Sequence, residues 1–283
     1  MAVRANINFR SPNRPLVCGI VNVTSDSFSD GGRYVDPKLA IKHALTLVEQ
    51  GADIVDIGGE STRPGSLPVS VDEELSRVLP VISGIRQQSE IPISIDTMKP
   101  EVAEQAMKAG ADIWNDVSAL RHDKTSLTKA AELGCPVVLM HMQGEPKTMQ
   151  DAPIYENVFC EVLDFLQSRI TAALQAGVAK TNILVDPGIG FGKTLQDNLK
   201  LLANLDKLQE QTDCPIMLGA SRKRMIGELD FSAPTDDRLG GSLALVAAAY
   251  YQGIAMVRVH DVRETVQMLR VLTAVDFQGK ANE

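Results

Sequence analysis

The sequence predicts a single-domain α/β protein, an eight-stranded (β/α)8 TIM barrel. Short apolar runs alternate eight times along the chain with segments whose apolar residues recur at helical spacing. The chain has 283 residues, 44% of them hydrophobic, which suits one large barrel core. No internal boundary or low-complexity segment divides it. A doubly wound open sheet is the competing fold, and the count and even spacing of the strands favour the barrel.

Strands are expected where apolar residues run together between turn-forming residues. Residues 1–15 precede the first run and form a short lead-in, a candidate hairpin, which Pro12 and Pro15 stop. Residues 16–283 form the barrel domain. The eight expected strands are residues 16–23, 53–57, 92–97, 113–117, 136–140, 182–185, 215–218 and 254–259.

Each expected strand is followed by a segment with a helical pattern. Residues 37–50 carry apolar side chains at helical spacing up to Gly51, and residues 71–88 begin with three acidic side chains, which favour a helix N-terminus. The expected helices are residues 37–50, 71–88, 100–109, 124–133, 157–176, 195–210, 236–251 and 262–274, with a short helical turn at 221–227.

Composition excludes several classes of function. The net charge of −8 argues against a nucleic-acid-binding face. Residues 1–14 lack the apolar core of a signal peptide, and the longest apolar run, residues 243–251, is too short to cross a bilayer. The four cysteines have no close-pair spacing, and three fall at predicted strands. We therefore expect a cytoplasmic protein whose cysteines are small buried hydrophobes, with no zinc site.

The segment 58–65, Gly-Gly-Glu-Ser-Thr-Arg-Pro-Gly, follows the second predicted strand and suits an anion. Glycines let backbone N–H groups approach a ligand, hydroxyls donate to its oxygens, and Arg63 offers a charge-assisted contact. Glu60 is a candidate partner that holds the shape of this loop beside Arg63.

Nearly every predicted strand ends in a polar group, and in a barrel these ends meet at one face, where active sites lie. Asp96, Asn115 and Asp186 each end an apolar strand. Each alone is compatible with a helix cap or a satisfied core group. Together, two carboxylates and an amide suit a ligand rich in N–H donors, such as an aminopyrimidine, or else a metal ion.

Residues 186–194, Asp-Pro-Gly-Ile-Gly-Phe-Gly-Lys-Thr, are similar to a phosphate-binding loop. They fail the nucleotide-binding pattern because Pro187 stands where its first glycine is required. We therefore expect a tight strand-to-helix turn, with Phe191 beside a planar ligand.

Four basic positions remain. Lys223, within the basic cluster 221–224, is a donor to a ring carbonyl or nitrogen, unless the cluster is a solvated charge run. Arg258 and His260 alternate along the last strand and so point the same way, which suggests an anion site, unless Arg258 pairs with Asp261 or Glu264. His141 is either functional or a packed histidine.

These motifs together resemble the bacterial dihydropteroate synthases, pterin-binding enzymes of the folate pathway. The resemblance covers the chain from about residue 17 to residue 262, in order. It rests on residues 21–32, 56–65, 94–97, 115–118, 140–144, 186–193, 221–223 and 258–261.

The resemblance implies a homodimeric barrel, with residues 16–283 as the pterin-binding domain. It implies Mg²⁺ as cofactor, and a reaction that joins dihydropterin pyrophosphate to 4-aminobenzoate with release of pyrophosphate. Sulfonamides are the expected inhibitors, and no membrane or nucleic-acid partner is implied. The hydroxyl that some members carry just after the lysine is replaced here by Arg224, which leaves a backbone N–H contact to the aminobenzoate carboxylate.

The same resemblance assigns roles residue by residue. The catalytic residues implied are Lys223, Asp96, Asp186 and Arg63. The implied pterin site is Asp96, Asn115, Asp186, Lys223, Met140, Phe191 and Gly219. Pyrophosphate is assigned to Asn22, Thr62, Arg63, Arg258 and His260, with Asn22 also touching the metal. The aminobenzoate pocket is assigned to Phe28, Thr62, Pro64 and Lys223.

Two other functions share the predicted pocket. A pterin-dependent methyltransferase would use Asp96, Asn115 and Asp186 without needing the long loops at residues 24–36 and 61–69. A non-catalytic pterin-binding paralogue is disfavoured because the cationic residues are intact. We expect the two loops to close over the substrates, since they are rich in glycine, serine and proline.

Overall fold

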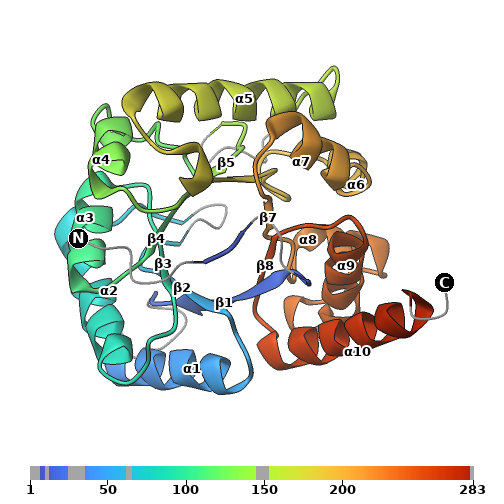
Figure 1. Ribbon diagram of the computed structural model, residues 1–283, viewed down its shortest axis with the longest axis horizontal. Helices are drawn as coiled ribbons and strands as arrows, with labels where there is room; N and C mark the ends of the chain where they lie inside the picture. The colour runs from blue at the N-terminus through green and yellow to red at the C-terminus, as the bar shows by residue number, and fades with distance from the viewer. Residues whose placement is uncertain (1–6, 10–12, 25–35, 62–65, 145–152, 281–283) are drawn as a thin grey trace.

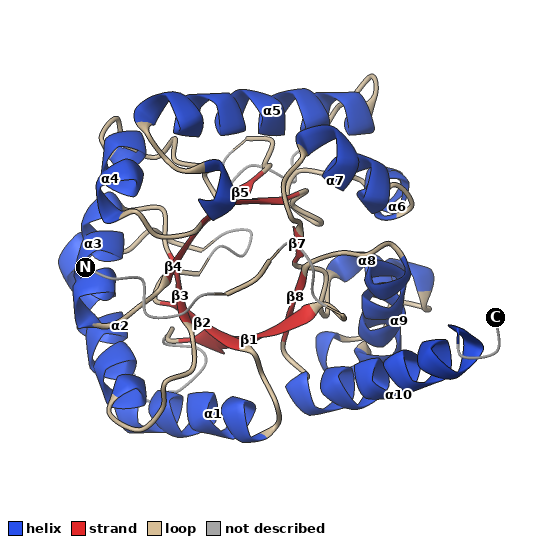
Figure 2. Ribbon diagram, in the orientation of Figure 1, coloured by secondary structure: helices blue, strands red, loops and turns tan. Residues whose placement is uncertain are grey.

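The computed structural model describes residues 7–9, 13–24, 36–61, 66–144 and 153–280. Eight parallel strands form a barrel surrounded by helices, as the sequence predicts (Figures 1 and 2). Neighbouring strands follow the order β6-β5-β4-β3-β2-β1-β8-β7, and a bridge between Val185 and Ile216 links β6 to the residue before β7. The carboxyl ends of all eight strands therefore lie at one face of the barrel.

Each strand is followed along the described chain by one or two helices. The strands are β1 (Leu16–Asn22), β2 (Ile54–Gly58), β3 (Ile93–Asp96), β4 (Ile113–Asp116), β5 (Val137–Met140), β6 (Ile183–Asp186), β7 (Met217–Leu218) and β8 (Met256–Val259). The helices are α1 (Pro37–Glu49), α2 (Val71–Arg86), α3 (Pro100–Ala109), α4 (Ser126–Leu133), α5 (Val158–Ala176), α6 (Leu195–Leu202), α7 (Leu205–Thr212), α8 (Arg224–Leu229), α9 (Leu239–Tyr251) and α10 (Val262–Lys280).

One predicted helix is two helices in the structure. Residues 195–210 divide into α6 and α7 because the side chain of Gln252 enters at the break. Its Oε1 accepts hydrogen bonds from the backbone N–H of Leu205 at 2.8 Å and of Asp206 at 3.3 Å, and so caps α7. The last helix, α10, also runs beyond its predicted end at residue 274.

An apolar layer closes the lower end of the barrel, where the strands begin. Inward-facing residues pack there against Phe9, which is 5% exposed. They are Cys18, Ile54, Ile113, Val138, Leu184, Met217 and Met256. The lead-in thus covers this end of the core, and the hairpin expected within residues 1–15 lies largely outside the described residues.

The cysteine prediction is confirmed at three positions and wrong at one. Cys18, Cys135 and Cys214 are buried, whereas Cys160 is exposed. Cys160 lies on α5, whose buried stripe runs through Val158 and Val162 and leaves residue 160 on the solvent side. Within the described ranges, no helix combines the length and apolar content that a membrane crossing requires.

Candidate active site

A polar layer lies above the apolar one, at the end of the barrel where the strands finish. It is formed by inward-facing residues of β2, β3, β4, β6 and β8 that the sequence places far apart. They are Asp56, Ser94, Asp96, Asn115, Asp186 and Arg258. The strand register puts Asp96 beside Asn115, and Met140 beside Asp186. The predicted acid–amide set is therefore assembled in one place.

Arg258 joins two of these carboxylates. Its Nε donates to Asp56 Oδ2 at 2.6 Å, and its Nη2 donates to Asp96 Oδ2 at 2.8 Å. Asn115 also donates to Asp56 Oδ2, at 3.4 Å. The alternative partner expected from the sequence, Asp261, binds Arg222 instead.

The charged groups of this cluster shift one another's pKa values. Burial raises the pKa of Asp96 to about 7, against the lowering effect of Arg258, and the charge of Asp56 adds to the rise. Burial alone would lower the pKa of Arg258, but Asp56 and Asp96 outweigh it and raise that pKa. Arg258 is thus a fixed cation between two acids, one of which titrates near neutral pH.

Asp186 and Lys223 form a second charged group across the barrel. The Asp186 carboxylate accepts the backbone N–H of Gly188 at 2.7 Å and lies beside Gly219. Burial raises the pKa of Asp186, while that N–H and the charge of Lys223 oppose the rise. Burial lowers the pKa of Lys223 to about 8, and Asp186 counteracts this. An acceptor and a donor therefore face the same space.

An apolar wall flanks the polar layer. Val117, Met140 and Met142 form a small buried cluster, against which Met98 and Phe191 pack. The Phe191 ring centroid lies 4.1 Å from Lys223 Nζ, a cation–π distance. Apolar side chains beside fixed donors and acceptors are suited to a flat heterocycle.

The remaining predicted residues are only partly located. Asn22 ends β1, and the register places Gly58 between it and Asp96. His260 follows β8, and its Nδ1 lies 3.0 Å from Ser221 Oγ. Phe28, Thr62, Arg63 and Pro64 lie outside the described residues.

Glu60, which precedes the 61–69 segment, is tied to its surroundings by two contacts. It accepts from Lys99 Nζ at 2.5 Å and from the backbone N–H of Val69 at 3.3 Å. The expected contact with Arg63 stays a prediction, because residue 63 lies outside the described residues. The same ammonium lies 2.5 Å from Glu74, which is fully buried. Lys99 was not singled out in the sequence, because a single lysine ahead of a helix carries no local signal of burial.

His141 is a packed histidine. It is 5% exposed, and its ring meets Phe165 edge-on, with the centroids 4.9 Å apart. Burial and the adjacent Lys193 ammonium lower the pKa of His141 to about 2, so its ring is neutral. Lys193, at the end of the loop that is similar to a phosphate site, is 4% exposed and contacts this ring.

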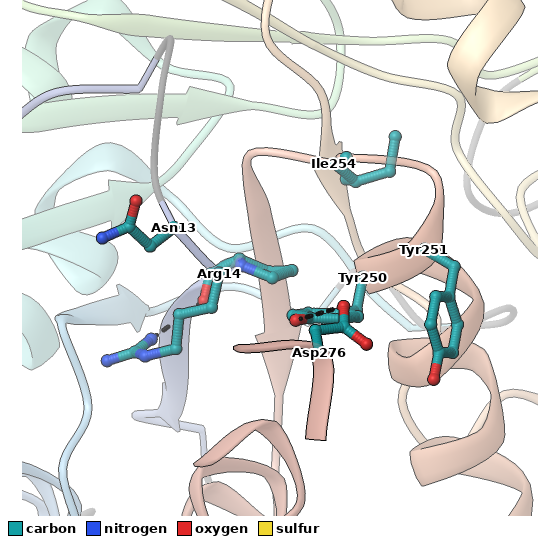
Figure 3. Close-up of a pocket in the computed structure, with 8 residues that line it drawn as sticks. Asn13, Arg14, Tyr250, Tyr251, Ile254 and Asp276 are labelled. Atoms are coloured by element: carbon teal, nitrogen blue, oxygen red, sulfur yellow. Dashed lines mark hydrogen bonds between the residues drawn. The ribbon is translucent and has the colours of Figure 1, made fainter. Parts of the chain in front are cut away.

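A recess at the opposite face of the barrel contains none of the predicted residues (Figure 3). It lies where β1 and β8 begin, and its lining includes Arg14, Tyr250 and Asp276. The Tyr250 hydroxyl donates to Asp276 at 2.8 Å, and Arg14 pairs with Asp53. These groups already satisfy one another, so the strand-end face remains the candidate active site.

Comparison with known proteins agrees with this geometry. Residues 18–260 match the family model described as "Pterin binding enzyme". Dihydropteroate synthase of Escherichia coli strain K12 is 51% identical over 271 residues, which cover 96% of this chain and 95% of that protein. The Xanthomonas albilineans dihydropteroate synthase solved with 4-aminobenzoic acid superposes with a TM-score of 0.87 at 50% identity, covering 93% of each chain. The Yersinia pestis enzyme solved with a sulfonamide drug gives a TM-score of 0.89 at 43% identity, covering 95% of this chain and 96% of that one.

Proposed function

The chain belongs to the dihydropteroate synthase family of pterin-binding enzymes, and on that premise we propose that it joins dihydropterin pyrophosphate to 4-aminobenzoate. The products are 7,8-dihydropteroate and pyrophosphate, which makes the enzyme a transferase of folate biosynthesis. The observation that carries the proposal is the presence of Asp96, Asn115 and Asp186 in the polar layer at the strand ends, together with Lys223, whose charge acts on Asp186.

These four side chains match the edge of a pterin ring. A pterin presents ring N–H and amino donors beside a carbonyl acceptor. Asp96 and Asp186 accept hydrogen bonds from the donors, and Asn115 both accepts and donates. Lys223 donates to the carbonyl or to a ring nitrogen. Met140, Phe191 and Gly219 line the faces of the ring.

The reaction needs little proton transfer at the start. The bond between the pterin methylene and the pyrophosphate oxygen breaks, and its electron pair leaves with pyrophosphate. The positive charge left on the pterin is stabilised by the carboxylates of Asp96 and Asp186, which are in place before the reaction begins. The aminobenzoate nitrogen then forms the new carbon–nitrogen bond and loses a proton. No nucleophile–histidine–acid arrangement is required.

Pyrophosphate is proposed to lie against the strand ends of β1 and β8. Asn22, Thr62, Arg63, Arg258 and His260 are the proposed contacts. In the described part of the chain, no cluster of three acidic, histidine or cysteine side chains is placed to hold a metal. The neutral amide oxygen of Asn22 fits Mg²⁺ that keeps most of its ligands as water and phosphate oxygens. Such an ion would neutralise leaving-group charge.

The aminobenzoate pocket is proposed to comprise Phe28, Thr62, Pro64 and Lys223. The carboxylate of the aminobenzoate would accept hydrogen bonds from the backbone N–H groups at the start of α8, which follows Lys223 directly. Because sulfonamides carry a similar aniline ring, we expect them to compete with aminobenzoate. Inhibition that does not depend on aminobenzoate concentration would contradict this assignment.

We also propose that two copies associate through α9 and α10. Helix α9 is apolar on nearly all sides, and it packs against α10. Large apolar side chains stay exposed on this pair, among them Tyr251 at 66%, Val275 at 60% and Phe277 at 70%. Sedimentation should show a dimer that Val275→Asp weakens.

The decisive test is pyrophosphate release with and without 4-aminobenzoate, in the wild type and in Lys223→Ala. We expect release that depends on aminobenzoate, forms dihydropteroate and falls at least a hundredfold in the variant, which loses a charged hydrogen bond and a fixed cation. Lys180→Ala is the control, since Lys180 donates to the Thr212 carbonyl oxygen and pairs with Asp213 at the far face of the barrel. Tight pterin binding without product would instead support the methyltransferase or the non-catalytic paralogue.

A further inference from the structure

The lysine of the loop that is similar to a phosphate site does not face solvent. Lys193 is 4% exposed, and its Nζ points into the turn that follows β6. It lies 2.9 Å from His141 Nδ1, 2.9 Å from the Gly188 carbonyl oxygen and 3.1 Å from the Phe191 carbonyl oxygen. A buried ammonium is costly unless it is fully hydrogen-bonded.

The partners of Lys193 in these contacts are uncharged. Because the His141 ring is neutral and its Nδ1 accepts, the ammonium donates to one ring nitrogen and to main-chain oxygens, including a longer contact of 3.4 Å to the His141 carbonyl. Burial lowers the pKa of Lys193 to about 7, consistent with an amine enclosed by neutral acceptors. This is a poor arrangement for capturing phosphate, which requires an available cation, and a good one for fixing a backbone turn.

The turn is fitted closely around this side chain. Gly188 has φ +68°, and a β-carbon there would lie 1.8 Å from the His141 carbonyl oxygen. From outside, the Tyr155 hydroxyl donates to the Gly192 carbonyl oxygen at 2.7 Å. Lys193 therefore links the exits of β5 and β6 from within.

The groups that the turn carries are those of the proposed pterin site. The backbone N–H of Gly188 donates to Asp186, the stem of Lys223 packs on Gly190, and the Phe191 ring lies over Lys223 Nζ. If the Lys193 ammonium were removed, the Phe191 carbonyl oxygen would lose this donor, and the Gly188 carbonyl oxygen would keep only the backbone N–H of Phe191, at 3.1 Å. The turn would then relax, and both Phe191 and the Gly188 N–H would move.

We propose that Lys193 is a positioning residue, which acts on the pterin through the 186–192 turn and has no contact with phosphate. The inference rests on the proposed function, because it concerns the same pterin site. In this proposal, Lys193 keeps the Phe191 ring and the hydrogen bond from the Gly188 N–H to Asp186 in place. Loss of the Lys193 ammonium should therefore weaken pterin binding and change pyrophosphate affinity little.

The test compares Lys193→Met with Arg86→Met. Arg86 is a partly buried cation that also donates to carbonyls, those of Gly110 and Ile91, but it pairs with Asp112 and lies at the opposite face of the barrel. Calorimetry should show Lys193→Met binding 6-hydroxymethylpterin at least tenfold more weakly, with inorganic pyrophosphate affinity within twofold of the wild type. Arg86→Met should lose thermal stability and keep both affinities.

A spectroscopic signal separates positioning from general destabilisation. In protein labelled with 4-fluorophenylalanine, the ¹⁹F resonance of Phe191, assigned with Phe191→Leu, should shift or broaden in Lys193→Met and not in Arg86→Met. Wild-type pterin affinity and an unchanged Phe191 resonance in Lys193→Met would overturn the proposal. So would an equal loss of pyrophosphate affinity, which would mean that Lys193 serves the phosphate.

Two other outcomes have different meanings. If the wild type binds no pterin, the proposed function fails, whatever Lys193 does. If Lys193→Met does not fold, Tyr155→Phe releases the same turn from outside and should weaken pterin binding about threefold, and wild-type affinity in that variant would contradict the role of the turn.

Discussion

The pterin affinity of this protein should depend on pH through Asp96. Burial places the pKa of Asp96 at about 7, and the proposed pterin contact requires the ionised carboxylate as an acceptor. The sign follows directly: as pH falls below 7, Asp96 takes up a proton in the free protein, which must be released before the ligand binds. Affinity for 6-hydroxymethylpterin should therefore fall with decreasing pH.

The size of the effect follows from the ionised fraction. With a pKa of about 7, the fraction ionised is about one half at pH 7 and about one eleventh at pH 6. The apparent dissociation constant scales inversely with that fraction, so it should rise about fivefold between pH 7 and pH 6. By linkage, binding at pH 6 should release roughly 0.9 proton from Asp96, against roughly 0.5 at pH 7.

Calorimetry in two buffers of different ionisation enthalpy measures that proton count directly. Asp96→Asn removes this titration, and should bind more weakly at pH 7 with a smaller proton release at pH 6. Asp186, whose pKa is also raised by burial, accounts for any remainder and is tested with Asp186→Asn. Equal proton release by the wild type and Asp96→Asn at pH 6 would refute the reasoning.

Three further predictions concern groups that hold the strand-end loops in place. Asp116→Ala removes the acceptor of two backbone N–H groups at 2.7 and 2.8 Å, and should lower the free energy of unfolding by roughly 2–5 kcal/mol in urea denaturation. Gly188→Ala should abolish pterin binding in titration calorimetry, because the new β-carbon would collide with the His141 carbonyl oxygen. Gly134→Ala is the control: Gly134 has φ +63° and open space around it, so this variant should bind pterin normally and lose about 1 kcal/mol of stability. Lys99→Met removes the ammonium that pairs with Glu60 and with the buried Glu74, and should cost roughly 3–5 kcal/mol in the same urea assay. Glu74→Gln in the same chain should restore part of this loss, and no loss on Lys99→Met would contradict the role of the two ion pairs.

Local pattern predicted most of the fold, since each strand is an apolar run and most helices carry an apolar stripe, whereas α9 is apolar on nearly all sides. It did not predict the break between α6 and α7, because the capping atom belongs to Gln252, 47 residues away from Leu205. Long-range contacts of this kind are visible only once the barrel has closed.

The site shows the same division. The polar strand ends predicted where Asp96, Asn115 and Asp186 would meet, because the carboxyl ends of barrel strands share one face. The partners of Arg258 were not predictable, since Asp56 is 202 residues away and Asp96 is 162, while Asp261 is its sequence neighbour. The glycine-rich loop fails the nucleotide-binding pattern in the sequence, yet the burial of its lysine had no signal there.

Barrel closure accounts for the electrostatics of the site. Arg258 on β8 reaches Asp56 on β2 and Asp96 on β3 across the barrel interior, so the cluster exists only in the closed fold. In that interior, water cannot reorganise around a developing charge, and fixed carboxylates stabilise a pterin cation more strongly than they would in solvent. The same burial raises the pKa of Asp96 and Asp186. The acids that would stabilise the cation are therefore also the groups whose protonation should weaken pterin binding, which ties the proposed catalysis to the pH dependence of affinity.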